Sequence, residues 1–131
     1  LQQLTKKLKL ENNIKFLGNM SNEWVLNYLR KYDLFIQAST FEGFGLTALE
    51  AVAARLPTIL SDVDGHLEIS DNGKYATLFK SGDPKDLANK IIKLSNEFKL
   101  IENKCLDANN YALNFFSIKH QVKRLDEIYN L

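Results

Sequence analysis

A carboxylate lies beside two glycines in the segment Glu42-Gly43-Phe44-Gly45, directly ahead of an apolar stretch suited to a helix. Gly43 and Gly45 let the backbone turn sharply and approach a ligand closely, because glycine has no Cβ. The helix that follows presents free N–H groups and a positive dipole end, which together bind anions such as phosphate. Glu42 would repel a phosphate, so it needs another partner. Sugar hydroxyls can donate to a carboxylate, and the predicted ligand therefore carries phosphate and sugar together.

A second carboxylate, Glu50, follows eight residues after Glu42 and lies one turn or more into the predicted helix. It can accept a hydrogen bond from a ribose hydroxyl. The run Thr47-Ala48-Leu49-Glu50 also has the spacing of a capping box, in which Glu50 only satisfies an amide at the helix start. On spacing alone both interpretations stay open.

The strands and helices that position these residues are predicted from the spacing of apolar residues, which alternates between two periods along the chain. Short apolar runs rich in strand formers alternate with segments of helical spacing. We expect strands at 14–17, 33–38, 57–61 and 76–79, and helices at about 21–32, 45–55, 66–70, from Asp83-Pro84 onward, 97–114 and 117–129. This order indicates an α/β fold, a parallel sheet with helices on both faces. Ligands of such sheets bind beyond the carboxyl ends of the strands, where residues 39–45 lie.

Length and composition exclude several classes of protein. The 131 residues match one domain, and 45% hydrophobic residues suffice for a core. With 17 basic and 16 acidic residues and no arginine-rich stripe, nucleic acid is not an expected partner. No apolar run approaches the roughly 18 residues of a spanning helix, and a single cysteine makes the cytoplasm the expected location. The chain begins at Leu1, so we expect a piece of a longer protein.

Several segments then carry a family resemblance. The run FEGFGLTALEA resembles the Glu-x7-Glu signature of the C-terminal, nucleotide-sugar-binding domain of retaining GT-B glycosyltransferases, family 4 (group 1). Four further segments are similar to that family, and together they cover nearly the whole chain: NIKFLG at 13–18, YDLFIQAST at 32–40, LPTILSDVDGHLEI at 56–69, and the pattern from Ala112 to Tyr129.

The resemblance implies a fold. Residues 1–131 would form a single, partial, Rossmann-like GT-B C-terminal domain that lacks its first two strands and carries extra C-terminal helices. The basic residues that neutralise the diphosphate follow the first of those strands, and the acceptor binds to a separate N-terminal domain. Neither is in this chain, so the chain alone is expected to be inactive.

The resemblance also implies roles for individual residues. Glu42 is the predicted catalytic residue and lies against hydroxyls of the transferred sugar, with a role as nucleophile a remote alternative. The predicted substrate-binding residues are Gly43, Phe44 and Gly45 through amides to the sugar, Leu46 and Thr47 through amides to the diphosphate, Glu50 on the ribose and Met20 near the nucleobase. Beside this motif the ribose role of Glu50 is preferred over capping. No cofactor and no metal site are expected, because no His, Cys or carboxylate cluster has ligand spacing.

The expected function is a hexosyltransferase-type, retaining transfer from a nucleotide-diphosphate sugar to a glycan, lipid or other acceptor, as in cell-envelope polysaccharide or glycolipid synthesis. Secondary expectations are peripheral association with the inner membrane face and self-association through exposed strand edges. The alternative from another class is a catalytically silent nucleotide-sugar-binding or subunit-interaction module. A weaker one is a sugar-phosphate phosphorylase or epimerase of the same architecture.

Other conspicuous residues have plainer interpretations. His66 follows Gly65 in a loop, has no paired acid or cysteine, and is a candidate for lining the site. Glu68 is a candidate for capping or anchoring its short helix. Phe44 is expected to pack in its turn, and Trp24 and Tyr28 to belong to the core. The lysine-rich stretches at 5–9 and 119–124 are expected to be solvated helix faces, with weak attraction to an anionic membrane as the lesser alternative.

Overall fold

The centre of the molecule is a small parallel sheet. The computed structural model describes the backbone of residues 1–130 and the side chains of residues 1–97 and 101–130. The strands are β1 (Phe35–Gln37), β2 (Thr58–Ser61) and β3 (Thr77–Phe79). They lie in the order β1-β2-β3, and both neighbouring pairs are parallel. Three of the predicted strands are therefore confirmed, each somewhat shorter than expected.

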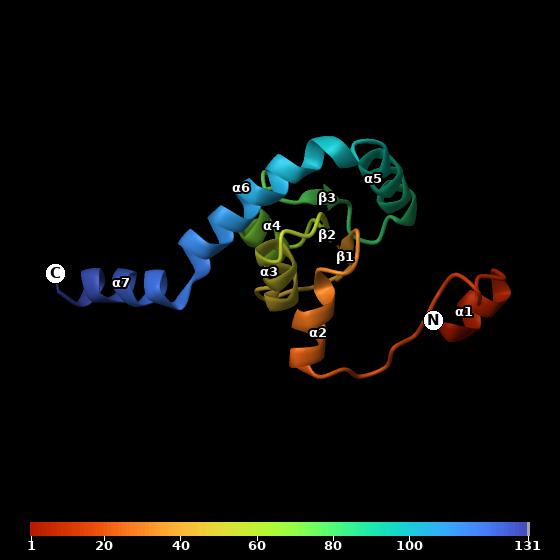
Figure 1. The fold of residues 1–131 in the computed structure, drawn as a ribbon, viewed down its shortest axis with the longest axis horizontal. Coiled ribbons are helices and arrows are strands. Elements are labelled where there is room, and N and C mark those ends of the chain that lie inside the picture. Colours follow the sequence, from red (N-terminus) through yellow and green to blue (C-terminus); the bar gives the residue numbers. More distant parts are fainter. Residues whose placement is uncertain (131) are drawn as a thin grey trace.

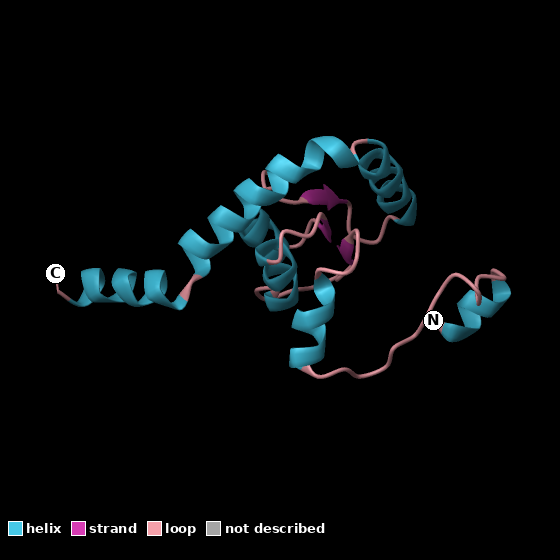
Figure 2. Ribbon diagram, in the orientation of Figure 1, coloured by secondary structure: helices cyan, strands magenta, loops and turns pink. Residues whose placement is uncertain are grey.

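Helices cover both faces of this sheet (Figure 1). Figure 2 shows how short the strands are beside them. The helices are α1 (Gln2–Lys7), α2 (Asn22–Leu29), α3 (Leu46–Ala53), α4 (Asp64–Ser70), α5 (Pro84–Asn96), α6 (Phe98–Phe116) and α7 (Ile118–Tyr129). The predicted class, a parallel sheet between helices with extra C-terminal helices, is confirmed.

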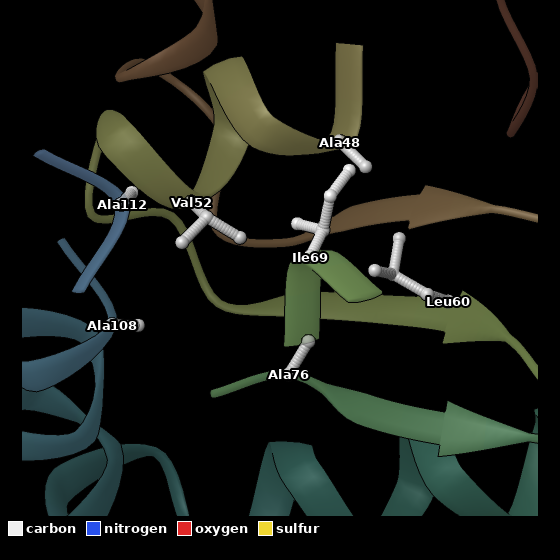
Figure 3. Close-up of a cluster of buried hydrophobic side chains, with 7 residues drawn as sticks. All are labelled: Ala48, Val52, Leu60, Ile69, Ala76, Ala108 and Ala112. Atoms are coloured by element: carbon white, nitrogen blue, oxygen red, sulfur yellow. The ribbon is translucent and has the colours of Figure 1, made fainter. Parts of the chain in front are cut away.

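The core lies on the two faces of β2, whose four residues are all buried. On one face Leu60 belongs to a cluster built from α3, α4, α6 and the residue before β3 (Figure 3), which contains Ala48, Val52, Ile69, Ala76, Ala108 and Ala112. On the other face Ile59 packs with Phe79, Leu94 and Ile101. Successive residues of a strand point to opposite faces, so Ile59 and Leu60 give β2 an apolar side chain on each face, between the buried polar residues Thr58 and Ser61. Each fully buried Ile or Leu contributes roughly 1.5–3 kcal/mol.

Side-chain caps fix where several helices begin. Ser21 Oγ accepts from the amide of Trp24 at 3.2 Å at the start of α2. Asp83 Oδ1 accepts from the amides of Lys85 and Asp86, both at 3.0 Å, and Pro84 is the first residue of α5. The predicted cap at Asp83-Pro84 is confirmed.

Residues 14–17 do not form the predicted strand. The amide of Ile14 donates to the carbonyl of Leu10 at 3.1 Å, and the chain then continues as coil to α2. Direct pairing of this segment with β1 is therefore wrong as well. An apolar run becomes a strand only where a neighbouring strand supplies its ladder, and here the coil leads away from the sheet (Figure 1). Association of two chains through the outer edge of β1 stays a prediction.

The prediction that Trp24 and Tyr28 belong to the core is wrong. Their rings stack on each other with centroids 4.4 Å apart, and Tyr28 is 37% exposed. The buried face of α2 is instead formed by Val25 and Leu29, which pack against Ala51 and Leu56. One helical position, about 100° of rotation, separates the two faces.

The lysine-rich helices are solvated, as predicted. Every lysine of α1 and α7 is exposed, and the described part of α7 has no buried residue. Figure 1 shows α7 extending away from the sheet at the end of α6, while α1 lies apart from it at the other end of the molecule.

Candidate functional site

The loop of residues 38–45 connects the carboxyl end of β1 to the start of α3, as predicted. Gly45 is the N-cap of α3 and has φ 85° and ψ 47°, a left-handed conformation that favours glycine. No side chain caps this helix. The amides of Leu46 and Thr47 therefore start a helix whose first turn is open to an acceptor from outside, and both residues are exposed.

The position of the cap decides between the two interpretations of Glu50. A capping box would make Thr47 the N-cap, but α3 begins at Leu46 after Gly45, and Thr47 is its second residue. The capping interpretation is therefore wrong. Glu50 lies in the second turn, half-buried, where its carboxylate is free of a capping role.

The carboxylate of Glu42 is half-buried and held by two side chains of its own segment. Gln37 Nε2 donates to Glu42 Oε2 at 2.8 Å, and Ser39 Oγ donates to the same oxygen at 3.4 Å. Gln37 belongs to β1, so the carboxylate is tied to the end of a strand. This orientation places a fixed negative charge four residues ahead of the open start of α3.

A contact that the sequence analysis missed fixes the backbone of this loop from α4. The amide of Gly65 donates to the carbonyl of Glu42 at 3.2 Å. A Cβ at residue 65 would lie 2.7 Å from that oxygen and 2.9 Å from the amide nitrogen of Phe44. Only glycine permits this approach. The signal in the sequence was Gly65, which directly precedes the helix predicted at 66–70.

His66 lies beneath the loop and does not line the open site. Its side chain is fully buried, so the lining role is wrong. Its Nδ1 lies 3.0 Å from the carbonyl oxygen of Ser61 and 3.1 Å from Ser61 Oγ. Because a carbonyl only accepts, Nδ1 carries the hydrogen. His66 Nε2 is buried without a partner among the described residues.

Gly45 completes the junction between His66 and Glu42. A Cβ at Gly45 would lie 3.2 Å from His66 Cδ2 and 3.3 Å from Glu42 Cγ. The glycine thus serves two needs at once, a left-handed backbone and room for two side chains. The imidazole of His66, the Cγ of Glu42 and Ile69, whose Cδ1 would lie 3.0 Å from that Cβ, thus surround the start of α3.

The other predicted site residues have mixed placements. Phe44 packs edge-on against Phe116 with centroids 5.7 Å apart, which confirms its packing role. Gly43 is exposed in the turn, with nothing within 4 Å of an added Cβ. Met20 is half-buried in the coil before Ser21, and the hydrogen bonds that hold the Glu42 loop do not include it. The fold therefore brings residues 42–50 together but does not join Met20 to them. Glu68 is exposed in the last turn of α4, so it does not cap the start of that helix.

Aromatic residues of α6 support the loop from the side. Tyr111 stacks on Tyr75 with centroids 4.2 Å apart and meets Phe116 edge-on at 5.6 Å. Burial, followed by the negative charge of Asp71, raises the pKa of the Tyr111 hydroxyl. These rings link the packing of Phe44 to the body of the domain.

The described residues contain neither a candidate metal centre nor a candidate membrane span. Among the described side chains, of residues 1–97 and 101–130, no group of three or more His, Cys, Asp or Glu is arranged to hold a metal ion. Within the same residues, no helix combines the length and the apolarity needed to cross a membrane.

The fold matches those of solved structures over nearly the whole chain. Sucrose-phosphate synthase from Thermosynechococcus elongatus superposes with a TM-score of 0.88 at 22% identity, over 98% of this chain and 32% of that one. Anabaena Alr3699/HepE, solved in complex with UDP, also gives 0.88, at 24% identity over 99% of this chain and 36% of that one. The fold is that of the GT-B glycosyltransferases.

The family follows from the sequence comparison. The family model described as "Glycosyl transferases group 1" matches residues 1–114, and this chain belongs to that family. N-acetyl-alpha-D-glucosaminyl L-malate synthase from Bacillus anthracis is 32% identical over 127 residues, which are 97% of this chain and 33% of that enzyme. The chain spans about a third or less of the length of the first curated relatives it matches.

Proposed function

We propose that this chain is the donor-binding part of a retaining glycosyltransferase, which transfers a sugar from a nucleotide-diphosphate sugar to an acceptor. The observation that carries the proposal is the uncapped start of α3 behind Gly45, with the fixed carboxylate of Glu42 beside it. Structures of Anabaena HepE were obtained with UDP and with UDP-glucose, which supports a nucleotide sugar as the ligand of this fold.

In this proposal the two carboxylates bind different parts of the ligand. The amides of Leu46 and Thr47 receive the diphosphate, and the backbone of residues 43–45 follows the sugar. Glu42 accepts from sugar hydroxyls through its free oxygen, and Glu50, one turn further along α3, accepts from the ribose. Met20 remains the candidate for the nucleobase.

The chemistry asks little of acid–base groups. The bond between the anomeric carbon and the diphosphate oxygen breaks, and its electron pair goes to that oxygen. The acceptor hydroxyl forms the new bond on the same face of the sugar, and its proton goes to the departing diphosphate. Amides preorganised at the helix start stabilise the charge that develops on the leaving oxygen, a type of interaction worth about 2.7–4 kcal/mol per donor in other enzymes.

The wider setting is a further part of the proposal. Two relatives are named O-antigen biosynthesis glycosyltransferases, WbnH and the probable WbiN of Escherichia coli. These names support a role in cell-envelope polysaccharide or glycolipid synthesis. A location at the cytoplasmic side, with peripheral membrane contact, stays a prediction. The acceptor would bind through another domain of the whole protein.

The test uses the whole protein that contains this chain. It is assayed for release of UDP or GDP from a panel of nucleotide sugars, with extracts of cell-envelope lipids and glycans as acceptors. Glu42→Gln and Glu50→Gln should each lower turnover by about tenfold or more, because each removes a charged hydrogen-bond acceptor from the donor. Glu102→Gln, an exposed carboxylate on α6, is the matched control.

The stereochemistry is read separately. NMR of the product should show the same anomeric configuration as the donor. Binding of nucleotide sugar without turnover by any acceptor would favour the silent binding module, and an inverted product would contradict the retaining assignment.

A further inference from the structure

Gln37 is a polar residue in an otherwise apolar strand. Its neighbours in β1 are Phe35 and Ile36. Its Nε2 donates to Glu42 Oε2 at 2.8 Å and lies 3.3 Å from Ser39 Oγ, which itself donates to Glu42 Oε2 at 3.4 Å. Both donors thus meet one oxygen of the Glu42 carboxylate. No described residue donates to the other oxygen, Oε1.

A buried network holds these donors in place. The carbonyl of Ser39 accepts from Ser61 Oγ at 2.7 Å and from Ser81 Oγ at 3.3 Å. Ser61 is fully buried, and its carbonyl in turn accepts from His66 Nδ1 at 3.0 Å. Residues at the end of β2, just after β3 and in α4 therefore fix the start of the loop. The chain of hydrogen bonds ends on Glu42.

Gln37 also has a feature that packing alone does not explain. Its Oε1 is buried and has no partner among the described residues. Such an acceptor is costly, and an apolar side chain of similar size would avoid the cost. The group of Gln37 that is used is the N–H, and it is used on Glu42. The amide is therefore better explained by the carboxylate it orients than by stability.

We propose that Gln37 is a positioning residue, which clamps Oε2 of Glu42 so that Oε1 faces a hydroxyl of the donor sugar. The proposal rests on the proposed function, since it concerns the same site. Gln37 does not touch the ligand. It restricts the carboxylate to one orientation, so the sugar does not have to order that side chain on binding. The effect should fall on the sugar and leave the nucleoside diphosphate unaffected.

The experiment measures how much the sugar adds to binding. Calorimetry gives the affinities of the whole protein for UDP-glucose and UDP, and for GDP-mannose and GDP, and the pair that the wild type binds is used. Gln37→Leu should lower the affinity for the sugar nucleotide by about tenfold, the size of a typical coupling between contacting residues, with diphosphate affinity unchanged within about twofold. Gln121→Leu, an exposed glutamine of α7, is the control.

A double-mutant cycle assigns the effect to Glu42. In a Glu42→Ala background the sugar should add little to binding, and Gln37→Leu should then change nothing further. An equal loss from Gln37→Leu in both backgrounds would overturn the proposal. The proposal would also be overturned if Gln37→Leu kept the wild-type ratio of sugar-nucleotide affinity to diphosphate affinity while Glu42→Ala lost it. A wild type that binds none of these nucleotides would instead overturn the proposed function.

Gln37→Glu provides a readout that a merely structural role would not change. It keeps the size of the side chain but places a second carboxylate where a donor stood. Two carboxylates at this distance share a proton at low pH, which restores a hydrogen bond between them. The sugar contribution should be lost at about pH 8 and return in part at about pH 5. A loss that does not depend on pH, in a protein with a wild-type melting temperature, would overturn the clamp.

Discussion

The amide of Gly65 donates to the carbonyl of Glu42 at 3.2 Å, across 23 residues of sequence, and leaves no room for a side chain between them. This contact joins the first turn of α4 to the loop that opens α3. It explains how a turn with two glycines can hold one conformation. The flexibility of Gly43 and Gly45 is restricted from outside the loop.

Gly65→Ala should therefore disturb the site. A Cβ would lie 2.7 Å from the carbonyl oxygen of Glu42, so either α4 or the loop must move. Overpacking of this kind costs about 1–3 kcal/mol. The melting temperature should fall, and affinity for a nucleotide sugar should fall further than stability alone explains. Gly43→Ala is the comparison for folding, because nothing lies within 4 Å of its Cβ. Equal melting temperatures for the two variants would contradict the contact.

The division of labour between the carboxylates gives a second prediction. Glu42→Gln should weaken transfer more than it weakens binding of the free nucleoside diphosphate, because Glu42 is assigned to the sugar. Glu50→Gln should weaken binding of the diphosphate itself, by about tenfold for one charged hydrogen bond. Calorimetry with the free diphosphate separates the two variants. An equal loss of diphosphate affinity in both would refute the assignment.

Much of the site could be predicted from the sequence because it is local. Glu42, Gly45 and Glu50 lie within nine residues, and the spacing alone implied a turn and an open helix start. The contacts of Gly65 and His66 could not be predicted in this way, because they depend on how α4 packs on the loop. Gln37 offered a visible signal, a polar residue in an apolar strand, but its partner became evident only in the folded chain.

The fold was predictable for a similar reason, but the prediction failed at one edge of the sheet. β2 is apolar on both faces, which requires cover on both, and the helices supply it. Residues 14–17 have the same local character but no neighbouring strand. A strand depends on its partner as much as on its own composition. The position of Trp24 and Tyr28 outside the core was missed because helical spacing defines an apolar stripe without saying which stripe is buried.

The cap of α5 should contribute to stability. Asp83 Oδ1 satisfies the amides of Lys85 and Asp86, so Asp83→Ala should cost about 1 kcal/mol and lower the melting temperature by roughly 4 °C. Asn89→Ala, at an exposed position of the same helix, should not lower it, since alanine favours helices. Thermal unfolding followed by circular dichroism makes the comparison. A cap variant as stable as the control would show that α5 does not need Asp83.

The single cysteine should react slowly. Burial raises the pKa of the Cys105 thiol, and the charge of Lys104 offsets this only in part. At a given pH the folded protein therefore holds less of the reactive thiolate than an unfolded chain. As the pH is raised, the rate of reaction with a disulfide reagent should begin to increase at a higher pH for the folded protein than for the chain unfolded in guanidinium. The same shift means that the protonated thiol favours folding below the ordinary pKa of cysteine, and that this contribution disappears as pH rises through the folded value. Superimposable pH profiles in the two states would contradict it.

The last prediction concerns the 131-residue chain by itself, which we expect to bind nucleotide sugars weakly and to transfer no sugar. The loop and the first two residues of α3, residues 39–47, contain no lysine or arginine, although a diphosphate carries about two charges. Each charge-assisted contact is worth roughly 1.5–3 kcal/mol, so two missing contacts would turn a micromolar ligand into a millimolar one. Amides at the start of α3 supply only part of that stabilisation.

Titration of the purified chain with UDP-glucose and GDP-mannose measures this directly, and a parallel assay follows hydrolysis and transfer. Catalysis should be absent, because an acceptor and a closed, water-free cleft are both needed to orient the attacking hydroxyl. Chemical shifts in amide spectra of the 15N-labelled chain should nevertheless move at Leu46 and Thr47 when the ligand reaches millimolar concentration. Micromolar binding, or shifts confined to residues away from the start of α3, would mean that the phosphate site lies elsewhere on the chain.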